Sequence, residues 1–595
     1  MVESSVPIGR FGRLSNRVPL IPSEVAVKRS DPLYNAHAYL TKVPVTAIEP
    51  FIEAFTEPGE VVLDMYGGSG MTGVTAMMLG RHGEVRDISV LGRHIGTNYV
   101  NLVDERTFRT AARRVVSLAR KRVGEVYATS CSRCQQSAEL SRTVWSVVYG
   151  CGACGEAINY YAAFEASGWT KAAMKCPSCE AAFLTRGARR LGETPVLDTI
   201  SCACTARLLD QEHIQPLVVP SLDDLAIPDR EIGADRQMFQ ASALAKHDLV
   251  TTASFFSPRN LVVLAALHEA IAGVRDKAIS GKLLFAFTAI LARASKRYQW
   301  HPKRPLNASN QNYYVAPAFY EWNVYDLFER KVSAAVRADL YLRSQAGRLG
   351  YPGLGSANYQ LASADALDLP DQSVNYVFTD PPFGSNIFYS DMNLFQEAWL
   401  GAVTEHGDEA VVDRSGNGAA RRTPERYERL ITDSLKEAHR VLVPEGWLSL
   451  VFSNSTGEMW ALVQRAITAA GFSLREVSTL DKGQRSVKGL ASGFENVVTV
   501  DLILSMCKAP KGSAPPIVNA PDGALDLAVD KVLDRSSDPN PSDVYVGVIR
   551  QFLRHCWDVT NVDIEGVGLV LRARGFEVDP RSGRLRIAEV DRLAS

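Results

Sequence analysis

Two apolar segments that each end in an abrupt turn constrain the fold of this chain most strongly. Residues 61–66 (VVLDMY) lead into the glycine-rich turn Gly67–Gly70, and residues 374–379 (VNYVFT) lead into a proline turn that starts at Asp380. Short apolar runs bounded by turn residues are typical of buried strands. More than half of the 595 residues lie between the two segments. We therefore expect one doubly wound α/β sheet whose two halves are separated by a large insertion.

The rest of the sequence divides by pattern around these two halves. Cysteine-rich sequence with polar turns follows the first half, helical periodicity precedes the second half, and a stretch rich in Pro, Gly and Ala predicts a linker before the C-terminal unit. The expected parts are the first half of the sheet, 31–125; a cysteine-rich insertion with short strands, 126–210; a helical region, 211–350; the second half of the sheet, 351–510; and a small C-terminal α/β unit, 525–595.

The glycine turn suits a ligand that must approach the backbone closely. Glycine has no Cβ, and the helix expected over 72–79 offers free N–H groups in its first turn. About 20 residues further on, Asp87 ends a second expected strand, where a carboxylate can accept from both ribose hydroxyls of a nucleoside-type cofactor. No Gly-Lys-Ser/Thr follows the turn, which disfavours phosphate binding. A tight turn without a ligand is the alternative for this motif alone.

The second turn, Asp380-Pro381-Pro382-Phe383, offers two rigidly held hydrogen-bond acceptors. Adjacent prolines fix two φ angles and remove two N–H donors, which holds the carbonyl groups of Asp380 and Pro381 in place. A carboxylate and a carbonyl at fixed spacing can both accept from one NH2 group, which leaves its lone pair free to attack, and Phe383 can stack on the base that carries the amine. Upstream, Asp365 stands where an acid can accept from a cofactor adenine. A strand-end turn without function is the alternative.

Together these motifs resemble those of amino-methyltransferases that use S-adenosylmethionine. VLDMYGGSGMTG is similar to their cofactor loop, in which proline and phenylalanine usually stand at the places of Met65 and Tyr66, and FTDPPFGSN is similar to the catalytic motif of the DNA adenine N6 type. Residues 34–44 resemble the segment that wraps the methionine end of the cofactor. The resemblance implies cofactor-binding roles for Lys42, Asp64, Tyr66, Gly68, Gly70, Asp87 and Asp365, and catalytic roles for Asp380, Pro381, Pro382 and Phe383.

Stretches at 255–264, 290–300, 312–331 and 386–400 extend the resemblance to long bacterial DNA methylases, here with a zinc-ribbon insertion. It implies a class I methyltransferase fold, with methyl transfer to the N6 amine of an adenine flipped out of DNA. Cytosine N4 enzymes share every motif, although their catalytic turn more often begins with serine. An RNA guanine N2 methyltransferase and an inactive zinc-ribbon DNA-binding protein are the other interpretations. The order of the motifs implies that target recognition lies in the insertion, in particular within 211–350.

Eight of the ten cysteines fall between Cys131 and Cys204, which in a long intracellular chain indicates metal ligation rather than disulfides. Two CxxC pairs separated by 16 residues predict one four-thiolate zinc site, and the later pairs predict a second. Both ions would be structural. Ligand exchange between the two sets is an open alternative, because such pairs can interleave. The predicted ligands are Cys131, Cys134, Cys151 and Cys154 for the first site, and Cys176, Cys179, Cys202 and Cys204 for the second.

Two basic stretches without acidic residues are candidate nucleic-acid contacts. One lies on a helix expected over 104–122, whose apolar face includes Phe108 and Leu118, and a solvated helix face explains it equally well. The other interleaves cations with aromatic rings, which suits phosphate contact and base stacking. Its candidate nucleic-acid-binding residues are Arg293, Lys296, Arg297, Tyr298, Trp300, Lys303 and Arg304.

The overall charge excludes a strongly basic protein, because 65 basic and 66 acidic side chains give a net charge of −1. Affinity for DNA, the expected partner, must therefore come from local patches. No apolar run approaches the ~20 residues of a membrane span, and residues 1–30 lack the apolar core of a signal peptide. We expect a cytoplasmic protein. No nuclease motif is present, so a role in restriction–modification or phage defence would need a separate nuclease or defence subunit.

Overall fold

A single eight-stranded sheet forms the centre of the protein in the computed structural model. The strand order is β10-β3-β2-β11-β12-β14-β13-β1, and all neighbours are parallel except β14, which is antiparallel to β12 and β13. The strands are β1 (Glu24–Ala26), β2 (Val61–Asp64), β3 (His82–Asp87), β10 (Ser356–Leu361), β11 (Val374–Thr379), β12 (Leu442–Phe452), β13 (Phe472–Asp481) and β14 (Asp501–Lys508). The structure describes residues 19–27, 30–213, 220–221, 224–303, 313–347, 353–384, 387–413, 422–481, 498–508, 515–536, 538–579 and 582–587.

The two halves of the chain meet in the middle of this sheet. Strand β2 of the first half pairs in parallel with β11 of the second half, with Val62 opposite Tyr376 and Leu63 opposite Val377. Alternate side chains then enter different cores: Val62 and Tyr376 belong to one, and Leu63 and Val377 to the other. The expectation of one doubly wound sheet with an insertion between its halves is therefore confirmed.

Helices cover both faces of the sheet. The core on the side of Val62 contains α2, α3 and helices of the insertion, and the core on the side of Leu63 contains α12, α13 and the C-terminal helices. The helices contributed by the two halves are α1 (Pro32–Ala36), α2 (Val45–Phe55), α3 (Met71–Met78), α4 (Val90–Val100), α11 (Tyr389–Glu397), α12 (Pro424–Val441) and α13 (Gly457–Ala469), with short 3-10 turns at Ala398–Leu400 and His406–Asp408.

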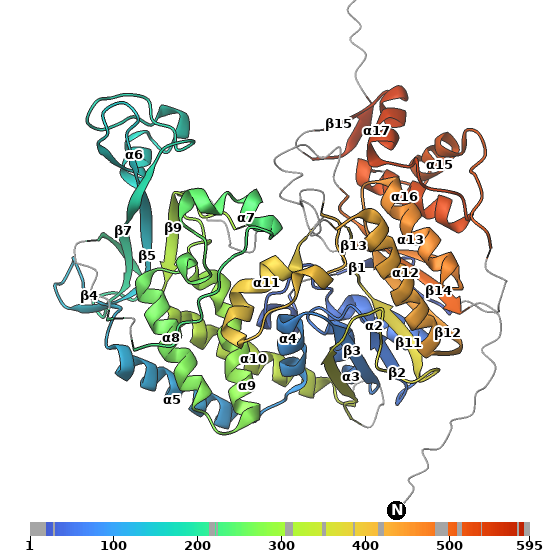
Figure 1. Cartoon of the computed structure of the whole chain (residues 1–595), viewed down its shortest axis with the longest axis horizontal. Coiled ribbons are helices and arrows are strands. Elements are labelled where there is room, and N and C mark those ends of the chain that lie inside the picture. Colours follow the sequence, from blue (N-terminus) through green and yellow to red (C-terminus); the bar gives the residue numbers. More distant parts are fainter. Residues whose placement is uncertain are drawn as a thin grey trace, which may run out of the picture.

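The insertion between β3 and β10 combines a second sheet with a helical layer. Its strands are β4 (Ala128–Ser130), β5 (Ser137–Gly150), β6 (Ala157–Asn159), β7 (Arg190–Ser201), β8 (Leu209–Glu212) and β9 (Ala318–Trp322). Its helices are α5 (Glu105–Val123), α6 (Tyr160–Ala166), α7 (Gln237–Ala241), α8 (Pro258–Ala272), α9 (Lys277–Ala294) and α10 (Val324–Gln345), with 3-10 turns at Lys171–Ala173, Leu244–His247 and Ala253–Phe255. Figure 1 shows the long β5–β7 ribbon projecting from the body with α6 in a lobe at its tip.

Three expectations about the insertion need correction. Its strands are not all short, because β5 has 14 residues and β7 has 12. The region expected to be helical contributes β9, which pairs with β5 over Ala318–Trp322 and ties the two parts of the insertion together. On α5, Phe108 is buried, but Leu118 is 46% exposed and does not complete the apolar face.

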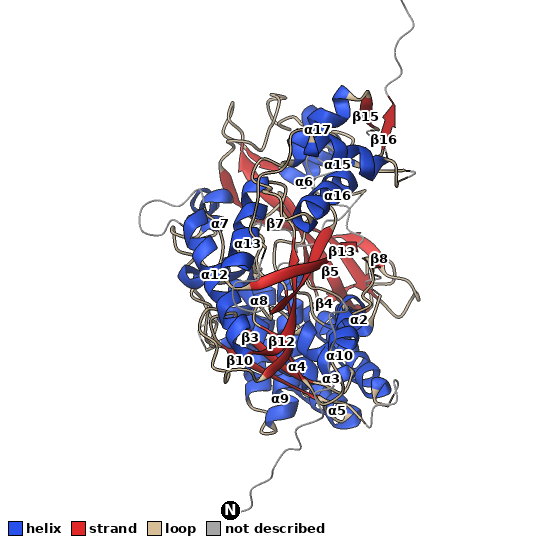
Figure 2. Cartoon of the chain, turned by 90° about the vertical axis from the view of Figure 1, so that its right-hand side faces the viewer, coloured by secondary structure: helices blue, strands red, loops and turns tan. Residues whose placement is uncertain are grey.

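The C-terminal unit consists of three helices and a hairpin, which Figure 2 shows together at one end of the molecule. Its elements are α15 (Ala524–Leu533), α16 (Pro541–Arg554), α17 (Ile564–Ala573), β15 (Phe576–Val578) and β16 (Leu585–Ile587). It docks on α13, since Asp563 accepts from the Gly457 N–H at 2.6 Å and Gln464 donates to the Trp557 carbonyl at 2.9 Å. Among the described residues, no helix has the length and hydropathy that crossing a membrane requires.

Candidate functional site: a cavity at the carboxyl ends of β2, β3 and β11

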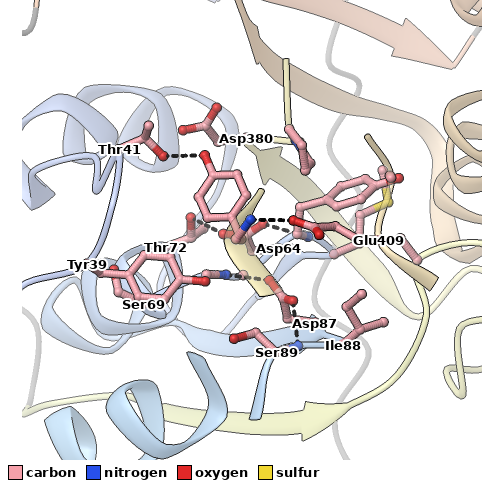
Figure 3. A pocket seen from close by; sticks show the side chains of 18 of the residues that line it. Tyr39, Thr41, Asp64, Ser69, Thr72, Asp87, Ile88, Ser89, Asp380 and Glu409 are labelled. Atoms are coloured by element: carbon pink, nitrogen blue, oxygen red, sulfur yellow. Dashed lines mark hydrogen bonds between the residues drawn. The ribbon is translucent and has the colours of Figure 1, made fainter. Parts of the chain in front are cut away.

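A cavity that is partly open to solvent lies where β2, β3 and β11 end. Open α/β sheets bind their ligands in the crevice outside the carboxyl ends of the strands. Figure 3 shows how side chains from several segments converge on this space. The residues singled out from the sequence that line it are Lys42, Asp64, Tyr66, Gly68, Asp87, Asp365, Asp380 and Pro382. Gly70, Pro381 and Phe383 are not among the described residues of its lining.

Asp64, the last residue of β2, links the glycine loop to the strand that carries Asp380. Its carboxylate accepts hydrogen bonds from the hydroxyls of Thr72 at 2.7 Å and Thr379 at 2.9 Å, and from the backbone N–H of Tyr66 at 3.2 Å. Burial raises the pKa of Asp64 to about 6, although these donors favour the charged form. The three donors hold the carboxylate within the cavity wall.

The glycine loop depends on close packing as well as on backbone conformation. Gly68 and Gly70 have φ values of 47° and 79°, in the region that favours glycine. A Cβ on Gly70 would lie 2.9 Å from the Cα of Gly96 in α4. Tyr359 of β10 supports the loop from behind, because its hydroxyl donates to the Gly68 carbonyl at 2.7 Å. Sequence reasoning missed Tyr359, which looks like any aromatic residue of a strand.

Asp87 holds the same loop from the end of β3. One carboxylate oxygen accepts from the Gly68 N–H at 2.7 Å and the other from the Ser89 N–H at 2.8 Å. Burial raises its pKa, and these two backbone donors oppose the shift. Asp365 lines the cavity from the loop before β11 and accepts from the Ser363 hydroxyl. The cavity wall thus carries carboxylates at the ends of two strands, as a nucleoside-type ligand requires.

Lys42 reaches the cavity wall from the N-terminal segment. Its ammonium group donates to the carbonyl oxygens of Leu33 at 2.8 Å, His37 at 3.1 Å and Tyr34 at 3.2 Å, and to the Tyr99 hydroxyl at 2.8 Å. Burial lowers the pKa of Lys42 to about 7. The ammonium group of Lys42 therefore holds together the turn that precedes it, in the N-terminal segment that lines the cavity. A direct contact between Lys42 and a cofactor stays a prediction.

The proline turn after β11 is fixed by two side chains in addition to its prolines. Tyr427 of α12 donates to the Pro382 carbonyl at 2.6 Å, and the Asn454 amide donates to the Phe383 carbonyl at 3.0 Å. The Phe383 ring is half-buried, and Asp380 lies on the cavity wall. The turn is therefore a rigid edge of the cavity.

Three lining residues that the sequence did not reveal hold the helix after this turn. The hydroxyls of Thr41 and Tyr389 lie 2.7 Å apart, which joins the N-terminal segment to the start of α11 (Figure 3). Glu409 accepts from the Tyr389 N–H at 2.5 Å and from the Ser390 hydroxyl at 2.6 Å. Burial raises the pKa of Glu409 to about 7. Glu409 lies in an irregular loop with no motif around it, so no sequence signal marks it.

The eight clustered cysteines form two groups of four at opposite ends of the β5–β7 ribbon. One group is Cys131, Cys134, Cys202 and Cys204, and the other is Cys151, Cys154, Cys176 and Cys179. The predicted division, with Cys131 to Cys154 in one site, is therefore wrong, and the interleaved alternative is confirmed. The reason is topological: β5 and β7 are antiparallel, so the pair before β5 meets the pair after β7.

The donor geometry of both groups fits a tetrahedral metal ion. Neighbouring sulfurs lie 3.5 to 3.8 Å apart, and four thiolates at Zn–S distances of ~2.3 Å lie roughly 3.8 Å from one another. Three of the four cysteine pairs sit on equivalent turns, in which Gln135, Gly155 and Glu180 adopt positive φ and donate their N–H to the first cysteine's carbonyl at 2.8 to 3.0 Å. Each group of four cysteines can therefore hold one tetrahedral metal ion such as Zn²⁺.

The basic aromatic stretch is only partly a surface. Arg297 is 6% exposed and Tyr298 is 8% exposed. The Arg297 guanidinium lies over the rings of Tyr313 at 5.5 Å and Phe395 at 5.1 Å, and burial lowers its pKa to about 10. The expectation of an exposed basic surface is wrong for these two residues, because both side chains complete cores.

The other residues of this stretch stay closer to solvent. Lys296 forms an ion pair with Glu193 of β7 at 2.8 Å. The remaining candidates are Arg293 and Trp300, which are half-exposed, Lys303, which is exposed, and Arg304, which lies outside the described residues.

Fold and cavity together resemble a Rossmann-like class I methyltransferase domain. The glycine loop follows the central strand β2, an aspartate ends the neighbouring β3, and the Asp-Pro-Pro-Phe turn follows β11 on the other side. Residues 19–105, which contain the glycine loop and Asp87, match the N6/N4 methyltransferase family model described as DNA methylase. The resemblance to S-adenosylmethionine-dependent DNA methylases is thereby confirmed.

Individual relatives match only parts of the chain. A segment of 41 residues is 51% identical to a protein of Escherichia coli (strain K12) named as a methylase, YubD, and spans 7% of this chain and 18% of that protein. Solved structures with similarity include TrmN of Thermus thermophilus (18% identity, 30% and 34% of the two chains, TM-score 0.15) and a DNA modification methylase of the same organism named TTHA0409 (16% identity, 28% and 68%, TM-score 0.15).

Proposed function

We propose that this protein is an S-adenosylmethionine-dependent DNA methyltransferase that methylates an exocyclic amine, with adenine N6 as the favoured target. One observation carries the proposal: Asp380 of the proline turn and the glycine loop with Asp87 line the same cavity. The two motifs lie on neighbouring strands, since β2 pairs with β11. The DNA methylase match over residues 19–105 supports DNA as the substrate.

The cavity residues fit the cofactor. Asp87 stands at the end of β3, where a carboxylate accepts from ribose hydroxyls, and Asp365 lines the wall where it can accept from an adenine amine. Gly68, without a side chain, lets a ligand reach the loop backbone. When bound, S-adenosylmethionine supplies a methyl group on a positively charged sulfur that is a good leaving group.

The chain's own contribution to the transfer is positioning and charge stabilisation. The Asp380 carboxylate and the Pro381 carbonyl accept hydrogen bonds from the target NH2 group, which directs its lone pair toward the cavity. As the nitrogen gains its bond to the methyl carbon, the Asp380 carboxylate stabilises the positive charge that develops there, and the nitrogen then releases one proton to solvent. The hydrogen bonds to the turn from Tyr427 and Asn454 keep these acceptors in place. A base inside a duplex cannot reach this edge, so the target is flipped out.

The test is methyl transfer from labelled S-adenosylmethionine to unmethylated genomic DNA, followed by digestion and separation of the nucleosides. We expect label in N6-methyladenosine. Label in N4-methylcytosine would keep the mechanism and change the base, and label in RNA alone would overturn the substrate. Bound cofactor without any transfer would favour the inactive DNA-binding interpretation.

The role of the proline turn is tested with Asp380→Ala. We expect this substitution to abolish transfer and to leave cofactor binding nearly unchanged, because Asp87 and the glycine loop remain. The matched control is Asp433→Ala, which removes an exposed carboxylate on α12 that pairs with Lys436. Transfer at the normal rate by the Asp380 variant would refute the assignment.

We also propose that both cysteine groups bind Zn²⁺ in structural roles, since four thiolates leave no position open to water. A cytoplasmic location belongs to the same proposal. A separate nuclease or defence-system subunit is a further proposed partner, to be tested by copurification from cells that express the full chain.

A further inference from the structure

Six aromatic side chains form two triads of contacting rings on one face of the ribbon sheet, here called the aromatic face, and Tyr161 and Trp300 of one triad also pack against the core that contains Tyr298 and Tyr320 of the other. They are Tyr161, Trp169, Tyr298, Trp300, Tyr320 and Trp322, and the rings in contact have centroids 4.9 to 5.8 Å apart. The opposite face of the sheet is already buried: Trp145 of β5 shares a core with Phe395 of α11, whereas its neighbour Val144 packs on the aromatic face. The aromatic face is therefore the side of the ribbon turned away from α11, with Tyr298 and Tyr320 buried and the rings of Trp169, Trp300 and Trp322 half-exposed.

Two arginines lie over the rings of Tyr298, Tyr320 and Trp322 on the aromatic face. The Arg142 guanidinium is 5.3 Å from the ring centroid of Tyr320 and 5.2 Å from that of Trp322. Arg293 lies 5.0 Å from the centroid of Tyr298 and 5.3 Å from that of Trp322. Within the described part of the chain, neither arginine forms an ion pair with a carboxylate. Their charges are therefore available to an anion.

Two lysines extend the positive charge of the aromatic face toward Trp169 and Trp300, beside the lobe at the tip of the ribbon. Lys171 follows Trp169 by two residues, and Lys303 follows Trp300 by three. Burial lowers the pKa of His301, and the nearby charges of Lys171 and Lys303 lower it further, so the two lysines lie on either side of a ring that is 6.1 Å from Phe164. Both are exposed, and neither has a carboxylate partner among the residues that the structure describes.

The acidic groups near this face do not cancel its charge. Glu193 is paired with Lys296 and with Arg190. Asp210 of β8 accepts from the Thr199 hydroxyl, and burial together with this carboxylate raises the pKa of Tyr320. Glu165 of α6 is exposed and, like Asp210, lies close to Tyr161. Against the two negative charges of Asp210 and Glu165 stand four cations, Arg142, Arg293, Lys171 and Lys303.

We propose that the aromatic face binds a DNA strand, with Arg142, Arg293, Lys171 and Lys303 at its phosphates and the half-exposed rings of Trp169 and Trp300 against its bases or sugars. The inference rests on the proposed function and deepens it by naming the surface that holds the substrate. Unpaired cations release condensed counterions when they meet phosphates, and aromatic side chains stack on bases without regard to sequence.

The dimensions and the placement of the face suit this partner. From Arg142 to Ser146, whose hydroxyl accepts from the Tyr161 N–H, β5 rises about 13 Å, the length of a few nucleotides. The buried side of the same sheet packs on α11, the helix that follows the catalytic turn. A strand on the aromatic face would therefore be held in a fixed relation to Asp380.

The test compares two quadruple variants of the full-length protein by binding to a 30-base-pair duplex over a range of salt concentrations. The first carries Arg142→Gln, Arg293→Gln, Lys171→Gln and Lys303→Gln. The control removes the same kinds of charge near the start of α9 and the end of α15 with Arg275→Gln, Arg535→Gln, Lys277→Gln and Lys531→Gln, all of them exposed. Circular dichroism and cofactor binding check that both variants are folded.

We expect the first variant to lose about 3 to 4 units of the slope of log K against log salt, at ~0.9 per phosphate contact, and at least tenfold in affinity at 150 mM salt. The control should keep the native slope. As a separate readout of the rings, Trp169→Ala should weaken binding by roughly 5- to 100-fold with the slope unchanged.

Native slope and affinity in the first variant would overturn the proposal. The proposal would also be overturned if the first variant keeps native DNA affinity but no longer retains a protein that copurifies with the native chain, because the aromatic face would then bind that protein. The proposed function is judged separately: it fails if the native protein binds DNA and cofactor but transfers no methyl group. The aromatic face fails if its variant still binds and methylates DNA like the native protein.

Discussion

The nested arrangement of the cysteines predicts that the two metal ions support different parts of the protein. Cys131 and Cys202 belong to the large core that also holds the sheet and the insertion helices. Cys151 and Cys176 instead belong to a small core of the ribbon lobe, with Phe164. Because metal binding to such sites is folding free energy, each ion should stabilise the core in which its ligands lie.

The perturbation is a pair of matched double substitutions, Cys176→Ser with Cys179→Ser at the tip and Cys131→Ser with Cys134→Ser at the base. Each should lower the metal content from two ions to one per chain. Structural zinc sites bind with about 10–16 kcal/mol. If the base site transmits ~10 kcal/mol of this to the main unfolding transition, its loss lowers Tm by roughly 8 °C, at ~2.1 cal/mol/K of unfolding entropy for each residue of the chain. The tip variant should keep the main transition within a few degrees.

The assays are metal analysis, thermal unfolding followed by circular dichroism, and limited proteolysis. We expect new cleavage within residues 151–189 in the tip variant and general cleavage in the base variant. Replacing Cys507 and Cys556, which lie outside both groups, controls for the loss of thiols. Equal shifts of Tm in the two variants would refute the assignment of the sites to separate cores, and a native protein without metal would refute the sites themselves.

Three further predictions concern the cavity. Asp64→Asn should flatten the pH dependence of stability. A carboxyl group whose pKa is raised from 3.8 to about 6 stabilises the fold while it is protonated, so ~3 kcal/mol of stability is lost as pH rises through this range. Urea unfolding at pH 4.5, 5.5 and 6.5 should show this loss only in the native protein, and parallel curves for the two proteins would contradict it. Tyr359→Phe removes the hydrogen bond to Gly68 and should cost ~1 kcal/mol of stability and weaken cofactor binding, which calorimetry can measure; native affinity would argue against support of the loop. Glu409→Ala leaves the Tyr389 N–H and the buried Ser390 hydroxyl without their acceptor, so it should lower the free energy of unfolding by about 2–3 kcal/mol. In urea unfolding, Glu409→Gln should lie between the native protein and the alanine variant. A loss of stability no larger for alanine than for glutamine would refute this.

Local chemistry made part of the fold predictable. The sequence Thr423-Pro424 predicts a helix start, and α12 begins at Pro424 with the Thr423 hydroxyl accepting from the Arg426 N–H at 3.2 Å. Residues 374–379 form β11 with the bounds that their apolar pattern indicates. Both signals depend only on residues a few positions apart, and so does the order of turn and helix after β2.

Contacts between distant residues were not predictable in this way. Cysteine spacing cannot tell which pairs share an ion, because that depends on the length and direction of β5 and β7. Nor does the pentapeptide that forms β9 look like a strand within its helical surroundings, since its partner β5 lies far away in the sequence. Arg297 has the composition of a surface residue, but its guanidinium fills a core between rings. Tertiary packing decides each of these cases.

Helix α4 connects the insertion to the cofactor loop, which suggests how DNA and cofactor binding communicate. On one side, Gly96 packs so closely against Gly70 that a Cβ on Gly70 would approach its Cα to 2.9 Å. On the other side, Lys282 of α9 donates to the Asn98 carbonyl at 2.7 Å, and the His94 ring nitrogen lies 3.2 Å from the Thr288 hydroxyl. A shift of the insertion helices cannot leave α4 in place without breaking these buried contacts, and a shift of α4 moves the wall against which the loop rests. If the insertion holds DNA, as we propose, its binding should therefore alter cofactor affinity, and by linkage the cofactor should alter DNA affinity by the same factor.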